Sequence, residues 1–535
     1  MKIYYYLIFA FLVLFSALAF GGSEPWGLLV FNITCLSLAW FILLKKHHFC
    51  YTSLSKTILI LLGFIVILSL LQLLNQHNFM QKPSFLPFTL CRYYSLEGLS
   101  LLFSLSLLYF ALTQIIERTK EIKIIALILT IGAVIVGLIG INWQKGEYIN
   151  LFRGVSMLSS FGPFASRNNG SQFVMAGFFI SLLLWLPHFI LDKKQRLPHK
   201  NIWYLTLSAI LFIGVLFAHS RGGVIALFLG LFTILFMGIL YLKKEKWSKI
   251  IYLIATIFIF GGIIGLIIQY SSYIGLREFG TFSDKSRLLL YGSAFDMLKD
   301  FPWTGVGFDA FSAAIDAYLK VSLKGFPRYL HNDWLELLLS FGYVFGTIII
   351  VFIGAIVFKL CKLFKGLEPK KQLRLAIICG GLVGFSFTAL IDFPFHLPAC
   401  ALLFFCLLVF ASAASFDKNV KEAKLYLPVK IVLILISLGL LFANLQYFRT
   451  WRSFVFARKL SPQIQVEQLS RDINIYPSPV FIKRVLLANY KTSLSKELTE
   501  EERQQIKEKT HNLSKKYLQK YPKDKQISQF FVITK

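Results

Sequence analysis

The stretch HNDWLELLLSFGYVFGTIIIVFIGAIVF, residues 331–358, decides the class of fold. Its apolar part, 334–358, exceeds the roughly 20 residues that a helix needs to cross the hydrocarbon core of a membrane. Outside this stretch the composition is similar, because 56% of all residues are hydrophobic and the mean hydropathy is +0.65. The surface of a soluble globule cannot cover so much apolar material. The sequence therefore predicts a polytopic membrane protein.

Apolar stretches of sufficient length predict about thirteen transmembrane helices. They lie near residues 3–20, 26–44, 57–74, 98–116, 124–142, 172–191, 202–218, 223–242, 250–269, 334–358, 373–391, 397–414 and 429–448. The first could be a signal peptide, because Lys2 precedes an apolar run that ends at small residues. Its length and the lack of a polar cleavage region favour a retained anchor.

Two domains are expected. Residues 1–448 form an all-α transmembrane domain that includes a large polar loop, 270–333. Residues 449–535 form a soluble extension with a different composition, in which prolines predict breaks between helices. Thr499 and Glu502 have the spacing of a capping box for one of these helices.

Lysines predict the orientation of the helices, because positive residues in short loops stay on the cytoplasmic side. They concentrate in six alternate loops, 45–56, 118–123, 193–200, 243–249, 359–374 and 418–430. With thirteen spans and the N-terminus inside, the loop 270–333 and the C-terminal extension are expected to be extracytoplasmic. The net charge of +29 follows from this topology, so no nucleic-acid partner is needed.

The expected outer face is poor in positive charge, and most of that charge is arginine. The guanidinium group matches phosphate with a permanently charged, bidentate fork. These arginines are Arg92, Arg153, Arg167, Arg221, Arg277, Arg287 and Arg328. The cysteines offer no outer pair for a disulfide, and no C-x-x-C motif or histidine cluster indicates a metal.

Arg221 and Arg287 are candidate phosphate-binding residues. Arg221 belongs to the motif SRGG at a short outer turn, where the two glycines would let backbone amides and the guanidinium share one anion. Arg287 starts an amphipathic segment that leads into the turn DFPWTGVGF, in which Gly305 and Gly307 shape the bend. The alternatives are an arginine that snorkels at the membrane surface, and a local salt bridge between Arg287 and Asp284.

His331 is the candidate general base. It lies where a predicted helix starts, with Asn332 or Asp333 available as the N-cap. A helix N-terminus disfavours the imidazolium ion and so keeps the ring able to accept a proton. Alone, such a histidine would be a capping or interfacial residue.

Two further outer motifs supply possible accessory residues. FGPFASRNNGSQF offers Arg167, Asn168 and Asn169 as hydrogen-bond donors to sugar or phosphate. DFPFHLP is expected to place Asp392 and His396 on one face. Each could equally be a helix cap.

Taken in order, these motifs resemble the O-antigen ligase and polymerase superfamily of bacterial envelope glycosyltransferases. The series is SRNNG, SRGG, R-x-x-L-x-x-x-A before DFPWTGVG, HNDWLELL-x-x-FG and DFPFHLP, over residues 161–416. In that family the SRGG arginine, an arginine early in the large loop and the HN histidine are functional. These match Arg221, Arg287 and His331. Asn169 departs from relatives that often carry histidine there, and the C-terminal extension is unlike the minimal ligase.

The resemblance implies a fold of the glycosyltransferase C type in the bacterial cytoplasmic membrane. It also implies a polyprenyl-diphosphate-linked glycan as donor, a hydroxyl of a glycan, lipid or protein as acceptor, and inverting transfer at the outer face. Two arginines would stabilise the leaving diphosphate, so no metal or other cofactor is expected. Ligase, polymerase and protein O-oligosaccharyltransferase activities remain open.

Two functions of other classes compete with glycan transfer. A lipid or solute transporter would bury ionisable residues near the middle of the membrane or show repeated halves. An anchoring protein would bind a partner through its extension. The predicted helices are nearly free of charge, which argues against transport.

Overall fold

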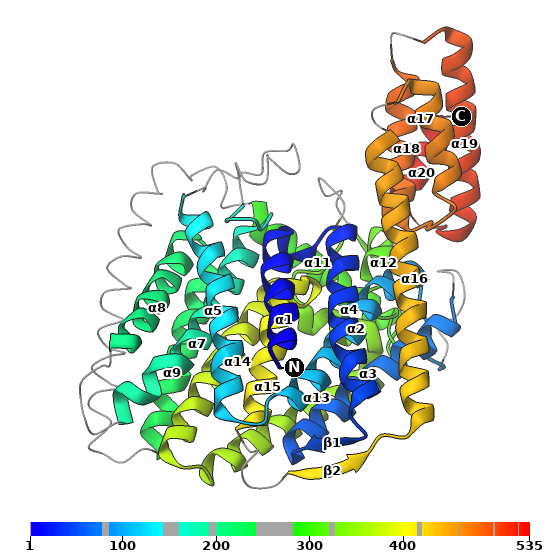
Figure 1. Ribbon diagram of the computed structural model, residues 1–535. Coiled ribbons are helices and arrows are strands. Elements are labelled where there is room, and N and C mark those ends of the chain that lie inside the picture. The colour runs from blue at the N-terminus through cyan, green and yellow to red at the C-terminus, as the bar shows by residue number, and fades with distance from the viewer. Residues whose placement is uncertain are drawn as a thin grey trace.

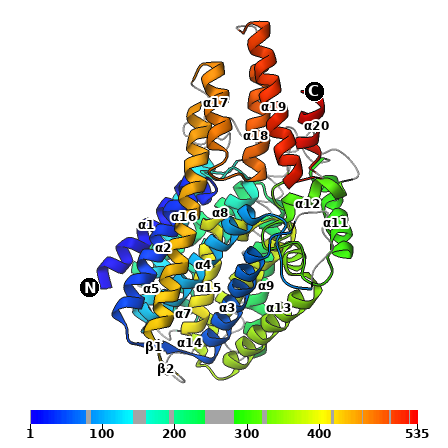
Figure 2. The same cartoon turned by 90° about the vertical axis from the view of Figure 1, so that its right-hand side faces the viewer.

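The computed structural model describes residues 2–77, 85–142, 160–191, 199–241, 282–319, 327–414, 420–457, 460–495, 498–522 and 524–534. Apolar helices stand side by side in a bundle, and a smaller group of helices projects from one of its ends (Figure 1). Figure 2 shows the same projection after a quarter turn.

The bundle is built from helices that coincide with predicted spans. They are α1 (Lys2–Leu18), α2 (Pro25–Lys45), α3 (Ser53–Leu74), α4 (Arg92–Ile115), α5 (Thr119–Asn142), α7 (Arg167–Leu191), α8 (His199–Phe217), α9 (Arg221–Tyr241), α13 (Asp333–Lys365), α14 (Pro369–Ile391), α15 (Pro398–Ala413) and α16 (Leu427–Ala457). The predicted span at 250–269 lies outside the described residues.

Nine of the described helices are long and apolar enough to cross a membrane, and three apolar ones are shorter. The prediction of an all-α polytopic membrane protein is confirmed. The number of thirteen spans and the glycosyltransferase C type stay predictions.

The lysine-bearing loops that the structure describes, 45–56, 118–123, 359–374 and 420–430, lie at one end of the bundle, which we call the lysine end. Two short strands, β1 (His48–Tyr51) and β2 (Lys421–Lys424), pair there in antiparallel register (Figure 1). Lys430 donates to the carbonyl of Lys46 over 2.9 Å. This ribbon was not predicted, and it fastens α16 to the start of the bundle.

The opposite end, which we call the site end, carries the short elements η1 (Phe20–Gly22), α11 (Phe282–Asp300), α12 (Phe311–Tyr318) and η2 (Pro394–His396). The turn between α11 and α12 packs against a break in α13 at Gly342, where φ is +66°. The amide of Val306 donates to the carbonyl of Leu339 over 3.0 Å, and that of Gly307 to Ser340 over 3.2 Å. The turn therefore satisfies carbonyls that the broken helix leaves without intrahelical partners.

The C-terminal extension consists of α17 (Pro462–Asp472), α18 (Pro479–Ser493), α19 (Glu500–Lys520) and α20 (Lys525–Ile533). Prolines begin α17 and α18, where their missing N–H costs nothing. The capping box of Thr499 and Glu502 is confirmed at α19. The end of α16 runs through the expected boundary at 448–449 without interruption.

A methyl group at Gly305 should loosen the turn that docks on α13. Gly305 has φ +71°, and an added Cβ would lie 2.2 Å from the carbonyl oxygen of Leu339. Gly305→Ala is expected to cost about 1–3 kcal/mol and to lower the unfolding temperature of the detergent-solubilised protein by several degrees. Gly354→Ala is the matched control, because nothing lies within 4 Å of a Cβ there. Equal unfolding temperatures in both variants would contradict this role of the turn.

Candidate active site

His331 and Asp392 form a histidine–carboxylate pair at the site end. Nδ1 of His331 lies 3.0 Å from Oδ1 of Asp392, and the Asp392 side chain is only 3% exposed. A carboxylate only accepts hydrogen bonds, so it fixes the proton on Nδ1 and leaves Nε2 as the basic nitrogen. Phe393 packs its ring edge-on against the imidazole, with the centroids 4.7 Å apart. The arrangement orients the ring as a general base requires.

The backbone of His331 is strained in a way that the surrounding structure holds in place. Its φ is +58°, in the left-handed region that non-glycine residues rarely adopt. The hydroxyl of Tyr291 on α11 donates to the His331 carbonyl over 2.8 Å. Asn332 is the N-cap of α13 and accepts from the amide of Leu335 over 3.0 Å, so one of the two predicted caps is confirmed.

Arg287 lies on α11 one turn before Tyr291, the residue that binds the carbonyl of His331. Burial raises the pKa of Tyr291, the positive charge of Arg287 lowers it, and Asp392 raises it. The hydroxyl of Tyr291 therefore lies in the field of both Arg287 and Asp392. The alternative partner of Arg287 was Asp284, whose side chain is not among those that the structure describes.

Arg221 is the first residue of α9 and is exposed. A Cβ at Gly222 would lie 2.3 Å from Ile391, so the start of α9 packs directly against the residue that precedes Asp392. The two glycines of SRGG therefore lie in the first turn of a helix, and the expected tight bend ends before them. Their missing side chains serve close packing, because a Cβ at Gly223 would meet Ser171 of α7.

Arg167 and Arg221 are the first residues of α7 and α9, and their guanidinium groups are near enough to interact electrostatically. Ser220 links the two motifs by donating to the side-chain oxygen of Asn168 over 3.0 Å. Sequence reasoning missed His219, which has φ +50° and is close to Arg167. Burial lowers the pKa of His219, and the charge of Arg167 lowers it further. Two arginines at two helix N-termini make this corner favourable for an anion.

His331 bonds to Asp392, and the hydroxyl of Tyr291, one turn after Arg287 on α11, donates to the carbonyl of His331. The first turn of α9, which begins at Arg221, packs against Ile391, the residue before Asp392. Asp392 and His396 do not act together, because each pairs with a different residue of the HND motif.

That second pair is His396 with Asp333, whose Nδ1 and Oδ1 are 2.9 Å apart. The other oxygen of Asp333 accepts from the amide of Phe395 over 2.9 Å. Residues 331–333 and 392–396 are therefore joined by two histidine–carboxylate pairs, and each segment supplies one histidine and one aspartate. Asp333 is a structural partner of η2 in this arrangement.

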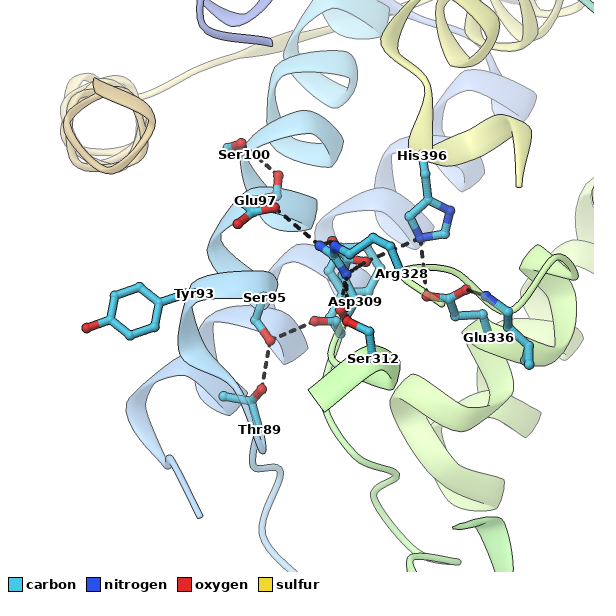
Figure 3. A network of polar contacts seen from close by, with 12 residues as sticks. Thr89, Tyr93, Ser95, Glu97, Ser100, Asp309, Ser312, Arg328, Glu336 and His396 are labelled. Carbon is cyan, nitrogen blue, oxygen red and sulfur yellow. Dashed lines mark hydrogen bonds and ion pairs between the residues drawn. The ribbon is translucent and has the colours of Figure 1, made fainter. Parts of the chain in front are cut away.

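Behind these pairs lies an ion cluster of Glu97, Asp309, Arg328, Asp333, Glu336 and His396, which we call the buried ion cluster because three members are buried and three are mostly buried. Figure 3 shows Arg328 between Glu97 and Asp309, with His396 reaching toward Asp309 and Glu336. Arg328 is 3.0 Å from Asp309 and 3.3 Å from Glu97. Its guanidinium also stacks 3.9 Å from the ring of Tyr94. Sequence reasoning grouped Arg328 with the exposed arginines, so this structural role was missed.

The cluster holds its charges by mutual compensation. Burial acts against the charged form of Arg328, but Asp309 and Glu97 together with the neighbouring tyrosines outweigh it and raise the pKa. Burial likewise acts against the imidazolium of His396, but Glu336 and Asp333 raise the pKa of His396 well above its usual range. Burial would raise the pKa of Asp309, but Arg328 and His396 hold it below its usual value. The carboxylates around His396 therefore favour its imidazolium form.

Asp309, Glu336 and His396 are also the described residues whose geometry could hold a metal ion. Their ligand atoms all lie within 4.8 Å of one another. A protonated histidine cannot act as a ligand, and the guanidinium of Arg328 already compensates Asp309. The donor set therefore fits a metal poorly, and metal independence stays a prediction.

An apolar cavity of about 800 Å³ lies among α3, α4, α9 and α13–α15. Side chains such as Leu61, Phe236, Ile353 and Phe404 line it, and Asp333, Glu336 and His396 lie among its polar lining. The cavity thus links an apolar space within the bundle to the residues beside His331.

Loss of the His396 charge should destabilise the site end. His396→Gln leaves three buried carboxylates with less positive charge, which is expected to cost about 3–5 kcal/mol. Because folding raises the pKa of His396, its stabilisation is complete below pH 6.5 and is lost as the pH rises through the folded pKa. The gap in unfolding temperature between wild type and variant should therefore shrink at alkaline pH. His48→Gln, at an exposed histidine of the lysine end, is the control and should change the unfolding temperature little. A gap between wild type and His396→Gln that stays constant at all pH values would contradict the charge of His396.

Residues 206–351 match a family model described as O-Antigen ligase. This segment contains Arg221, Arg287 and His331, and it ends within α13. No curated protein matches the chain. The match and the apolar helices indicate a multi-pass membrane protein that transfers glycans. This segment of the chain is therefore similar to the O-antigen ligase family.

Proposed function

We propose that the chain transfers a glycan from a polyprenyl diphosphate to an acceptor hydroxyl at the outer face of the bacterial cytoplasmic membrane. The observation that carries the proposal is the pair of His331 and Asp392, beside which lie the start of α9 at Arg221 and the tyrosine one turn after Arg287 on α11. A base with two permanent cations nearby would suit a reaction in which a hydroxyl loses its proton and a diphosphate leaves.

The arginines act on the leaving group. Breaking the bond between sugar and diphosphate leaves negative charge on the diphosphate, and guanidinium groups stabilise that charge without a divalent cation. The start of α9 adds backbone N–H groups and the positive end of a helix dipole. Arg167 is near enough to Arg221 to extend the same anion site.

His331 acts on the acceptor. Its Nε2 removes the proton from the acceptor hydroxyl, whose oxygen forms the new bond to the anomeric carbon while the bond to the diphosphate breaks. Attack from the face opposite the leaving group inverts the configuration at that carbon. Asp392 is a positioning residue, because it holds the ring and stabilises the imidazolium that forms.

The apolar cavity supports a lipid-linked donor. A polyprenyl chain is a flexible hydrocarbon, and the side chains that line the cavity are mainly aliphatic and aromatic. Because the cavity reaches residues next to His331, a chain within it would leave its diphosphate at the site end.

Transport is less well supported by the same structure. Glu97, Asp333 and Glu336 of the buried ion cluster lie in the first two turns of α4 and α13, and Asp309 lies in the turn before α12, so these carboxylates are at helix ends or in a connection. Ligase, polymerase and protein glycosylation remain alternatives within the proposed chemistry. Deletion of the gene and analysis of surface glycans would separate them, through loss of capped lipid, of chain length or of glycoprotein.

Removal of one arginine should slow transfer at least about tenfold, because a charge-assisted hydrogen bond contributes roughly 1.5–3 kcal/mol. Arg287→Ala and Arg287→Lys should both be impaired, since lysine cannot offer the bidentate fork. The measurement is release of polyprenyl diphosphate from a synthetic lipid-linked glycan, in membranes of the deletion strain that express each variant. Arg471→Ala, at an exposed arginine of α17, is the control, and EDTA should not slow the wild type. Full activity in both Arg287 variants removes this residue from the mechanism.

His331→Ala should abolish release of polyprenyl diphosphate while binding of the lipid-linked donor stays close to normal. The variant removes the base but none of the proposed diphosphate contacts. His511→Ala, in α19 of the extension, is the matched histidine control. Normal transfer by His331→Ala would require another base among Asp284, Asp300, Asp333 and Asp392.

A further inference from the structure

The C-terminal extension is fixed to the site end by buried contacts. Lys483 of α18 lies 3.0 Å from Asp316 of α12, and it also pairs with Asp524, so an ion triad joins the two domains. The hydroxyl of Tyr476 donates to the carbonyl of Tyr93 over 2.6 Å. Cys91, Tyr94 and Ala310 share one apolar cluster with side chains of α18 and α19. The extension therefore has a defined position over the membrane domain.

A cavity of about 700 Å³ opens between the two domains. That volume falls within the range of roughly 300–1,000 Å³ that is typical of small-molecule sites. One wall belongs to the membrane domain, and the other consists of α16, α18 and α20. The second wall carries Tyr447, Trp451, Arg484, Gln526, Gln529 and Phe530.

This wall has the chemistry of a carbohydrate site. Aromatic faces pack against the C–H faces of a sugar ring, and carboxamides donate to and accept from its hydroxyl groups. Arg484 adds a donor fork for hydroxyls or for the carboxylate of an acidic sugar. It lies close to Tyr447, with which it interacts electrostatically, and 5.9 Å from the ring of Phe454.

The cavity meets the proposed reaction centre on the side of the base. Phe393 lines it and packs against the ring of His331. Ser166 and Asn169, which lie on either side of Arg167 in the sequence, also line it, whereas Arg221 and Arg287 are absent from its described lining. A sugar in the cavity would therefore contact Phe393 beside the base without contacting Arg221 or Arg287, the two arginines assigned to the leaving diphosphate.

We propose that the cavity between the membrane domain and the C-terminal extension binds the carbohydrate part of the acceptor. This inference rests on the proposed function, because it assigns the acceptor to that same reaction centre. In this arrangement α18 and α20 select the acceptor sugar, and Phe393 lies between the sugar and the ring of His331.

The test measures binding as well as transfer. Full-length protein in detergent micelles is examined by saturation-transfer-difference NMR against methyl glycosides of hexoses, N-acetylhexosamines and hexuronic acids. Gln526→Ala combined with Gln529→Ala should weaken binding of the recognised glycoside about tenfold, because two hydrogen-bonding groups are lost. Gln504→Ala, on the exposed side of α19, is the matched control and should bind as the wild type does.

The outcomes separate the two proposals. Absence of any glycoside signal in the wild type, or an unchanged signal in the double variant, overturns the cavity as a carbohydrate site. Displacement of the glycoside by a water-soluble prenyl diphosphate overturns its assignment to the acceptor. In the transfer assay the double variant should raise the acceptor KM about tenfold with little change in kcat. Normal transfer by His331→Ala would defeat the proposed function and leave the binding result intact.

Discussion

The double histidine–carboxylate pairing of residues 331–333 with 392–396 is the interaction on which the site depends. Two histidine–carboxylate contacts, of 3.0 and 2.9 Å, join the start of α13 to the connection between α14 and α15. His331 has a strained backbone, so it needs partners on several sides to hold one orientation. Asp392 fixes its ring and Tyr291 fixes its carbonyl. The base is thus held by three segments that are distant in sequence.

The buried ion cluster shares Asp333 and His396 with that pairing. It shows how a membrane protein can bury several charges at one place. Burial opposes each charge, and a buried pair stabilises a fold only if its geometry and its other hydrogen bonds are good. Arg328 meets this condition, with contacts to Asp309, Glu97 and the face of Tyr94. The cluster therefore defines the position of the α11–α12 turn relative to α4 and α13.

The sequence predicts the helices well, because a long apolar segment in a membrane must satisfy its own backbone hydrogen bonds, and a helix does so within one segment. It also selects Arg221, Arg287 and His331, whose roles stay predictions. It could not identify the partner of His396, because Asp333 lies 63 residues away and no local pattern links them. The strands at the lysine end were missed because four-residue segments carry too little alternation. The glycines of SRGG were placed in a bend, since sequence alone did not show Ile391 packed against them.

The unbroken length of α16 has a consequence for the reach of the molecule. Its 31 residues span roughly 46 Å, about 15 Å more than the hydrocarbon thickness of a bilayer. The ribbon anchors its first turn, so the surplus emerges as a stiff pillar of constant height. α18 and α20 form one wall of the cavity between the two domains, and α16 joins this wall to the ribbon at the lysine end. The helix therefore works as a spacer that sets how far the extension stands from the lysine end.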